Sequence, residues 1–163
     1  MKINIVIIGL NYEYNLDICD MLADKTGMFF LDVNQFLNYS LLSRKNMEEL
    51  CGIEYLEQQE DSVVKSCSEF ENSVICMPHM YFLRNEQYKN FDGSVIIYIR
   101  NSKEYLEKLN NITDQMYNTL PVDVIGFEDK DIELKDISYL TVNVKNKKKE
   151  TIVNEILTKL GGN

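Results

Sequence analysis

The chain has 163 residues, of which 45% are hydrophobic and 26% are charged, and its formal net charge is -9. Such a length and composition fit one globular domain that buries its core without disulfide bonds. The negative charge argues against a surface for nucleic acid or for an anionic membrane, because both are polyanions. We find no apolar run of about 18 residues that could span a membrane, and the first residues lead directly into a strand pattern without a signal peptide.

The four cysteines, Cys19, Cys51, Cys67 and Cys76, include no C-x-x-C pair, and the sequence has one histidine. This spacing argues against a zinc site, so no metal is expected. Cys19 and Cys76 lie among apolar residues, where a reduced cysteine behaves as a small hydrophobic residue. Reduced cysteines without an export signal favour a cytoplasmic protein.

Strand and helix patterns alternate along the chain, which predicts repeated βα units and a parallel sheet with helices on both faces. We therefore expect a single α/β domain over residues 1–163, with three α/β/α layers and a mostly parallel five-stranded sheet. The segment 110–136 is the least regular, and an extra edge strand could lie within it. The expected strands are 3–8, 28–32, 73–77, 94–100 and 139–144, with the extra strand at 122–127. The expected helices are 16–25, 33–43, 47–70 with a break near Gly52, 85–91, 102–111 and 147–160.

Ligands of parallel sheets bind at the carboxyl ends of the strands, so the first loop is the first place to look. The β-branched run that ends at Ile8 is closed by Gly9, and a polar, aromatic loop leads to a helix pattern near Leu16. This is the frame of a phosphate-binding loop. The pattern G-x-x-x-x-G-K-[ST] fits from Gly9, but its last three positions are Tyr14, Asn15 and Leu16. The glycine, the lysine and the hydroxyl that hold phosphate and Mg²⁺ are therefore missing.

Further segments, taken with this frame, resemble the shikimate kinases of the P-loop phosphotransferase class over nearly the whole chain. The resemblance implies a P-loop kinase-like fold and a family activity that uses ATP and Mg²⁺. The segments that carry it are 28–34 (MFFLDVN), 52–60 (GIEYLEQQE), 74–80 (VICMPHM) and 137–143 (ISYLTVN).

The departures from the family pattern are systematic. Of two family aspartates, Asp32 remains and the second is Asn34, while the substrate-binding arginine is replaced by Glu57. A carboxylate at that position repels the carboxylate of shikimate. The Gly-Gly-Gly turn of the family is replaced by three bulkier residues, Pro78, His79 and Met80. The lid segment is shortened, which leaves too little chain for the lid arginine and the helix after it. It also has no arginine between residues 110 and 130. A second family arginine aligns loosely with Lys130.

We therefore expect a shikimate kinase-like protein that has lost phosphoryl transfer and has a binding, regulatory or scaffolding role. It could act beside another enzyme of aromatic amino-acid biosynthesis, with no cofactor. The alternative is a divergent ATP-dependent small-molecule kinase that binds ATP and Mg²⁺ and keeps Asp32 as its catalytic residue. A third hypothesis is a structural homodimer, or a complex with another protein, formed through a tyrosine-rich end.

Several single residues allow two interpretations. Asp32 is either a catalytic carboxylate or the N-cap of the next helix. Glu13 and Asp17 either complement the helix dipole or occupy the abandoned phosphate site. Glu57 and Glu60 either chelate a metal or form a solvated acidic face, and His79 could be a general base, although no nucleophile can be assigned to it. Three tyrosines at the same end of the sheet either fill a former cleft or form a recognition surface: Tyr12, Tyr14 and Tyr81.

Overall fold

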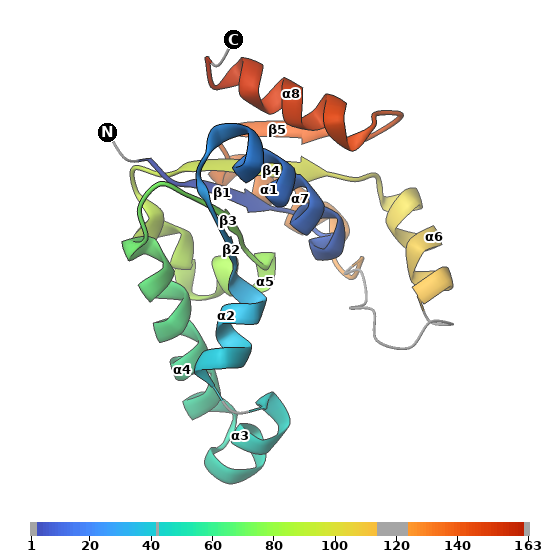
Figure 1. The fold of residues 1–163 in the computed structure, drawn as a ribbon. Helices are drawn as coiled ribbons and strands as arrows, with labels where there is room; N and C mark the ends of the chain where they lie inside the picture. Colours follow the sequence, from blue (N-terminus) through green and yellow to red (C-terminus); the bar gives the residue numbers. More distant parts are fainter. Residues whose placement is uncertain (1–2, 42, 114–123, 162–163) are drawn as a thin grey trace.

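A computed structural model describes residues 3–41, 43–113 and 124–161 of the chain. Its sheet has five strands, all parallel, in the order β2-β3-β1-β4-β5 (Figure 1). The predicted parallel sheet with helices on both faces is confirmed. The strands are β1 (Ile5–Ile8), β2 (Phe29–Asp32), β3 (Ser73–Cys76), β4 (Val95–Arg100) and β5 (Leu140–Asn143).

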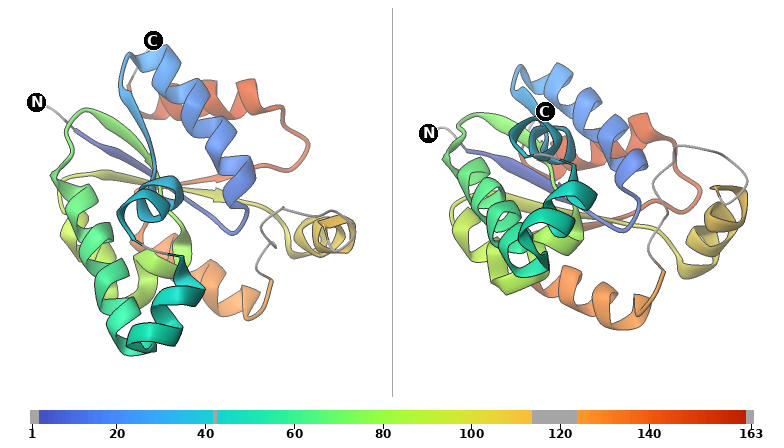
Figure 2. Two further views of the ribbon diagram at one scale, coloured as in Figure 1. Left: turned by 60° about the horizontal axis from the view of Figure 1, so that its bottom comes forward. Right: turned by 90° about the horizontal axis from the view of Figure 1, so that it is seen from below.

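Helices connect the strands on both faces of the sheet, as Figure 2 shows from two further sides. The break predicted near Gly52 is confirmed, because this glycine separates α3 from α4 with a φ of 86°. The helices are α1 (Tyr12–Thr26), α2 (Val33–Ser40), α3 (Arg44–Cys51), α4 (Ile53–Ser66), α5 (His79–Leu83), α6 (Lys103–Thr113), α7 (Phe127–Ile137) and α8 (Lys149–Lys159), with shorter helical segments at Cys67–Glu69 and Arg84–Phe91.

The core consists of two apolar layers that the sheet separates. Alternate residues of β1 point to opposite faces, so Ile5 and Ile7 pack under α1 and α8, while Val6 and Ile8 pack on the other side. On that second side the buried partners come from α2, α4, α5, α6 and α7 and from the shorter helical segments. All four residues of β1 are buried, as its unbroken β-branched sequence predicts for a central strand.

Helix α7 differs from the sequence-based expectation. We expected an edge strand at 122–127 and too little chain for a helix before the last strand, and both expectations are wrong for the described residues. Residues 125–126 form a turn, and the eleven-residue helix α7 follows. A buried hydrogen bond holds this helix to β4, because the Tyr98 hydroxyl donates to Asp131 Oδ1 over 2.7 Å. Arg100 and Lys135 also pair with this carboxylate.

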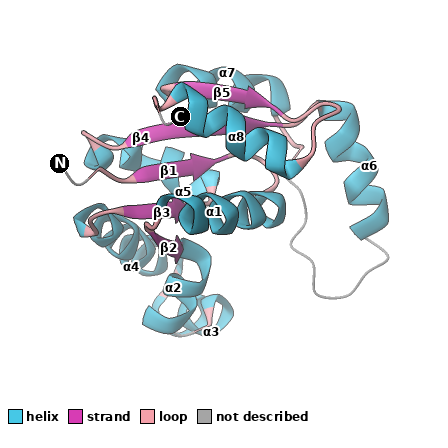
Figure 3. Ribbon diagram, turned by 45° about the horizontal axis from the view of Figure 1, so that its top comes forward, coloured by secondary structure: helices cyan, strands magenta, loops and turns pink. Residues whose placement is uncertain are grey.

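Helix α6 stands to one side of the layers, beyond the carboxyl end of β4 (Figure 3). Ser102 caps its first turn, since the Ser102 hydroxyl accepts a hydrogen bond from the backbone N–H of Tyr105. The lid segment that precedes α7 lies mostly outside the described residues. None of the helices in the described ranges is long and apolar enough to cross a lipid bilayer.

The residue that brings the start of α1 close to β4 is Gly9. A Cβ atom at this position would lie 2.5 Å from the carbonyl oxygen of Ile99. We predict that Gly9→Ala lowers the free energy of unfolding by about 1–3 kcal/mol, the usual cost of forcing extra volume into a packed site. Chemical denaturation measures this difference.

The matched control is Gly27→Asn, because Gly27 has open space around it and asparagine tolerates its left-handed backbone. This variant should change stability by less than about 0.5 kcal/mol. Equal stability of Gly9→Ala and the parent protein would contradict the close approach of the two backbones.

Candidate functional site

The candidate site lies where β1, β2 and β3 end, because parallel strands bring their carboxyl ends to one edge of the sheet. Ile8, Asp32 and Cys76 are the last residues of these strands. The segments that follow them contain most of the positions that the sequence singled out. The loop after β1 is shorter than expected, and its length determines where the side chains of the following helix lie.

Helix α1 begins at Tyr12, not near Leu16, so only residues 9–11 join it to β1. Asn11 is the N-cap, and its side-chain oxygen accepts from the backbone N–H of Tyr14 over 3.3 Å. The N–H of Asn15 donates to the Asn11 carbonyl over 3.1 Å. These two N–H groups are therefore hydrogen-bonded within the first helical turn. In a phosphate-binding loop such groups point at the anion instead. The expected open loop at residues 11–15 is therefore wrong.

The hydroxyl of Tyr12 occupies the junction of the three strand ends. It donates to the carboxylate of Asp32, lies 3.2 Å from the carbonyl oxygen of Cys76, and accepts the backbone N–H of Asn34 over 3.1 Å. Asp32 Oδ1 also accepts the N–H of Gln35 over 3.2 Å. This bond confirms the interpretation of Asp32 as the N-cap of α2. Because Tyr12 itself follows β1, its side chain links this segment to the ends of β2 and β3.

Burial is the main reason why the pKa of Tyr12 lies far above its usual value, and the neighbouring Cys76 and Asp32 raise it further. A phenol in this setting stays protonated and acts as a donor to the carboxylate. Asp32 Oδ1 accordingly accepts from a neutral hydroxyl and from the backbone N–H of Gln35, so this oxygen is already hydrogen-bonded.

Asn15 stands at the position of the missing lysine and is fully buried. Neither atom of its side-chain amide has a hydrogen-bond partner among the described residues. Its neighbour Leu16, also in α1, packs against the apolar layer that α1 and α8 form on one face of the sheet. Tyr14 lies under Lys149, whose Nζ is 5.1 Å from the centre of the ring and also pairs with Asp17. Asp17 thus contacts a lysine of α8, which supports a role other than occupying the phosphate position.

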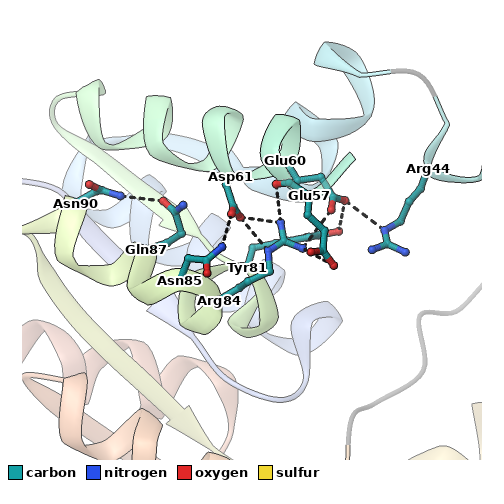
Figure 4. Close-up of polar contacts among 9 residues, drawn as sticks. All are labelled: Arg44, Glu57, Glu60, Asp61, Tyr81, Arg84, Asn85, Gln87 and Asn90. Carbon is teal, nitrogen blue, oxygen red and sulfur yellow. Dashed lines mark hydrogen bonds and ion pairs between the residues drawn. The ribbon is translucent and has the colours of Figure 1, made fainter. Parts of the chain in front are cut away.

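The substrate-side residues form a separate ionic cluster between α4 and the segment after β3 (Figure 4). Arg84 lies at its centre, with Nη2 2.7 Å from Asp61 and Nη1 3.3 Å from Glu60. Glu57 is at its margin, where its carboxylate is 3.9 Å from Arg84. Glu60 is buried and also contacts Arg44 over 3.3 Å, while the Tyr81 hydroxyl donates to it over 3.1 Å.

This cluster overturns the interpretation of Glu60 as part of a solvated acidic face. Its carboxylate is held by two arginines and a tyrosine, and the described residues contain no group of three potential ligands that could hold a metal. Sequence reasoning missed Arg84, because it lies more than twenty residues from its partners in the chain. Tyr81 belongs to this cluster through its bond to Glu60, whereas Tyr12 is bonded to Asp32.

The three residues in place of the glycine turn form the start of a one-turn helix. Pro78 is the N-cap of α5 and His79 is its first residue. The side chain of His79 is buried, whereas Met80 is 56% exposed. A buried histidine has little access to a substrate proton, which disfavours the general-base interpretation.

We predict that Tyr12→Phe lowers the free energy of unfolding by about 1–3 kcal/mol, because it leaves the carboxylate of Asp32 and the N–H of Asn34 without their common partner. Denaturant unfolding at neutral pH checks this value. Tyr139→Phe is the matched control, since Tyr139 is 71% exposed and should change stability by less than about 0.5 kcal/mol. Equal losses in both variants would show that the Tyr12 hydroxyl contributes nothing specific.

Alkaline pH should destabilise the protein through the same hydroxyl. The pKa of Tyr12 is raised in the folded protein, whereas an unfolded tyrosine ionises near pH 10. The unfolded state therefore loses this proton first, and stability is intact below about pH 10 and falls above it. Tyr12→Phe should reduce this slope by about 1.4 kcal/mol per pH unit. Unfolding curves between neutral pH and pH 11 measure the slope, and identical slopes would contradict the buried phenol.

The sequence matches no protein-family model and no curated protein. Solved structures match it closely in fold. The shikimate kinase of Bacteroides thetaiotaomicron has a TM-score of 0.78 at 12% identity, with 99% of each chain covered. That of Aquifex aeolicus has a TM-score of 0.72 at 23% identity, covering 98% of this chain and 96% of that chain.

The shikimate kinase of Acinetobacter baumannii, solved in complex with shikimate, has a TM-score of 0.71 at 14% identity, covering 98% of this chain and 93% of that chain. At such identities the likeness concerns the fold. The strand order, the helices on both faces and these neighbours together establish that the chain has a shikimate kinase-like fold of the P-loop kinase class.

Proposed function

We propose that this chain is a non-catalytic, cytoplasmic shikimate kinase-like protein with a binding, regulatory or scaffolding role. The observation that carries the proposal is the Tyr12 hydroxyl, which is hydrogen-bonded to Asp32 at the end of β2 and lies 3.2 Å from the carbonyl oxygen of Cys76 at the end of β3. A working kinase needs that space for phosphates, Mg²⁺ or the acceptor hydroxyl. In this chain a side chain of the protein itself occupies it.

The charges around this position also support the proposal. Phosphoryl transfer depends on positioned cations that stabilise the developing negative charge. The lysine position is the uncharged, buried Asn15, and the positive charge of nearby Lys149 is paired with Asp17. A triphosphate would therefore enter a protein of net charge -9 without a cationic cradle at the start of α1.

The substrate side supports the same conclusion. Glu57 replaces the arginine that would bind a carboxylate, and the guanidinium groups of Arg84 and Arg44 are already paired with acidic side chains. Recruiting Arg84 for a substrate would leave the buried Glu60 and its neighbour Asp61 without that partner. Breaking such a buried ion pair costs several kcal/mol, about 3–5 when one partner is lost.

The second candidate is a divergent ATP-dependent small-molecule kinase. It is favoured by the position of Asp32 at the end of β2, where a kinase would present a carboxylate. A sugar kinase from Janibacter, with a TM-score of 0.65 at 13% identity, has a similar fold. Under this candidate Tyr12 would have to leave Asp32 when nucleotide binds.

Calorimetric titration with ATP and Mg²⁺ separates the two candidates. We expect no saturable heat at micromolar protein and millimolar nucleotide, and no ADP formed with shikimate in a coupled assay. The shikimate kinase of Aquifex aeolicus serves as the positive control for both measurements. Saturable binding of ATP with Mg²⁺ would overturn the proposal.

Asp32→Asn is the diagnostic variant. Under our proposal it reduces stability, since Asp32 caps α2 and accepts from Tyr12, and it changes no catalytic rate. Under the alternative it abolishes ATP turnover. Turnover that is present in the parent and absent in Asp32→Asn would establish the kinase.

A further inference from the structure

Strand β2 is one edge of the sheet. It lies outside β3, and no other strand in the described part of the chain pairs with its free side (Figure 3). The N–H of Phe29 donates to the Asn72 carbonyl over 2.9 Å, so the backbone polar groups of Phe29 face β3. Successive residues of a strand direct these groups to opposite sides, so the N–H and C=O of Phe30 face away from the sheet. Such unpaired groups are a template for a further strand.

The side chains of β2 do not protect this edge. Edge strands usually carry a lysine, a proline or a bulge that prevents pairing, whereas β2 has the sequence FFLD in regular register with β3. Phe29 is 72% exposed and Phe30 is 40% exposed. Strand side chains alternate, so these two rings lie on opposite faces of the sheet. Because β2 has only four residues, a partner strand gains few backbone bonds and depends on side-chain contacts at both faces.

The face that carries Phe29 is apolar. Leu31 shares this face and packs against the core layer of α2 and α4, to which Phe36 also belongs. Phe36 and Phe70 form an edge-to-face pair with ring centroids 5.8 Å apart, and Phe70 is still 41% exposed. The pair borders a pocket of about 340 Å³, lined by Phe36, Ser66, Glu69 and Phe70. This face therefore suits an apolar side chain of a partner.

The face that carries Phe30 is acidic. Val74, the register partner of Phe30, belongs to the core layer under α1 and α8, so Phe30 points to that side. Helix α1 contacts β2 and carries two exposed carboxylates, Asp20 and Asp24, which form no ion pair in the described ranges. Lys25 of the same helix is hydrogen-bonded to α8 instead. A second copy of this chain, of net charge -9, would add negative charge here, whereas a basic segment would neutralise it.

We propose that β2 binds an extended, basic segment of another protein, which adds an antiparallel strand to the sheet. The partner residue opposite Phe30 exchanges both backbone hydrogen bonds with it. That residue is lysine or arginine, because its stem covers the Phe30 ring and its charge lies on the side of Asp20 and Asp24. The residues before and after it point to the other face and are apolar, because they meet Phe29 and the pocket at Phe70. The recognised pattern is thus apolar-basic-apolar.

This inference goes beyond the proposed function, which concerns the space at Tyr12 and Asp32. The outward backbone groups of Phe30 do not depend on whether nucleotide binds at the strand ends. A kinase and a non-catalytic protein could both carry such an edge, so the ATP titration and the peptide titration described next fail independently.

The probe is the acetylated and amidated peptide Lys-Leu-Lys-Leu-Lys, titrated into the full chain by isothermal calorimetry. We expect saturable binding that weakens with salt, since part of it is ionic. The same peptide with N-methyl groups on the backbone nitrogens of its lysines keeps every charge but loses the N–H that pairs with the Phe30 carbonyl. It should bind at least about tenfold more weakly. This control separates strand pairing from nonspecific attraction to an acidic protein.

Variants of the protein test the two parts of the surface. Phe30→Pro removes the outward N–H and the ring, while the bonds to β3 remain, so it should keep the fold and lose at least about tenfold in affinity. The double variant Asp20→Asn, Asp24→Asn should also bind about tenfold more weakly. Its matched control, Glu48→Gln, Glu49→Gln on α3, removes the same charge elsewhere and should bind as the parent does. Circular dichroism checks the fold of each variant.

Three results would overturn the proposal: no saturable binding at millimolar peptide, affinity unchanged by N-methylation, or equal affinity of the parent and the folded Phe30→Pro variant. If Phe30→Pro does not fold, the N-methylated peptide and the aspartate variant decide. Sedimentation velocity tests whether a second copy covers the edge, and we expect a monomer. A dimer of the parent that Phe30→Pro dissociates would overturn the assigned partner.

Discussion

The start of helix α1 at Tyr12 determines what the carboxyl end of this sheet can hold. Gly9 lets the chain pass against the carbonyl oxygen of Ile99, and Asn11 caps the helix two residues later. The early start places the Tyr12 hydroxyl against Asp32 and turns the Asn15 side chain into the interior. The first turn of α1 therefore fills the space at the ends of β2 and β3. It also leaves buried polar groups without hydrogen-bond partners near β4.

The sheet could be predicted from the sequence because its strands are short β-branched runs separated by helical periodicity. The N-cap at Asp32 could also be read from the sequence, since capping depends on residues three apart. Helix α7 could not be predicted in this way. A bond between Tyr98 and Asp131 joins it to the sheet across 33 positions of the chain, and a local pattern does not contain such a contact. The start of α1 was misplaced because an asparagine among tyrosines fits a loop and a cap equally well.

In the candidate site, too, local sequence patterns reveal some features, whereas others depend on contacts between distant segments. Motif spacing singled out Gly9, which follows β1, Asp32, which ends β2, and Glu57, which lies on α4. It could not identify the partners of these residues, because those partners come from distant segments. Glu57 and Glu60 read alone suggest an acidic face, whereas Arg84 and Arg44 convert the region into a neutralised cluster. The unpaired amide of Asn101 is likewise a property of its surroundings and not of its residue type.

The central position of β1 has a consequence for how the molecule is made. Ile5 pairs with Val74 on one side and with Val95 on the other, so this strand leaves the ribosome well before either of its partners is synthesised. Closing such long loops costs entropy and slows folding. Its four apolar residues remain unpaired during that interval, which exposes them to chaperones and to aggregation. A strand that is buried in the finished protein is therefore exposed during its synthesis.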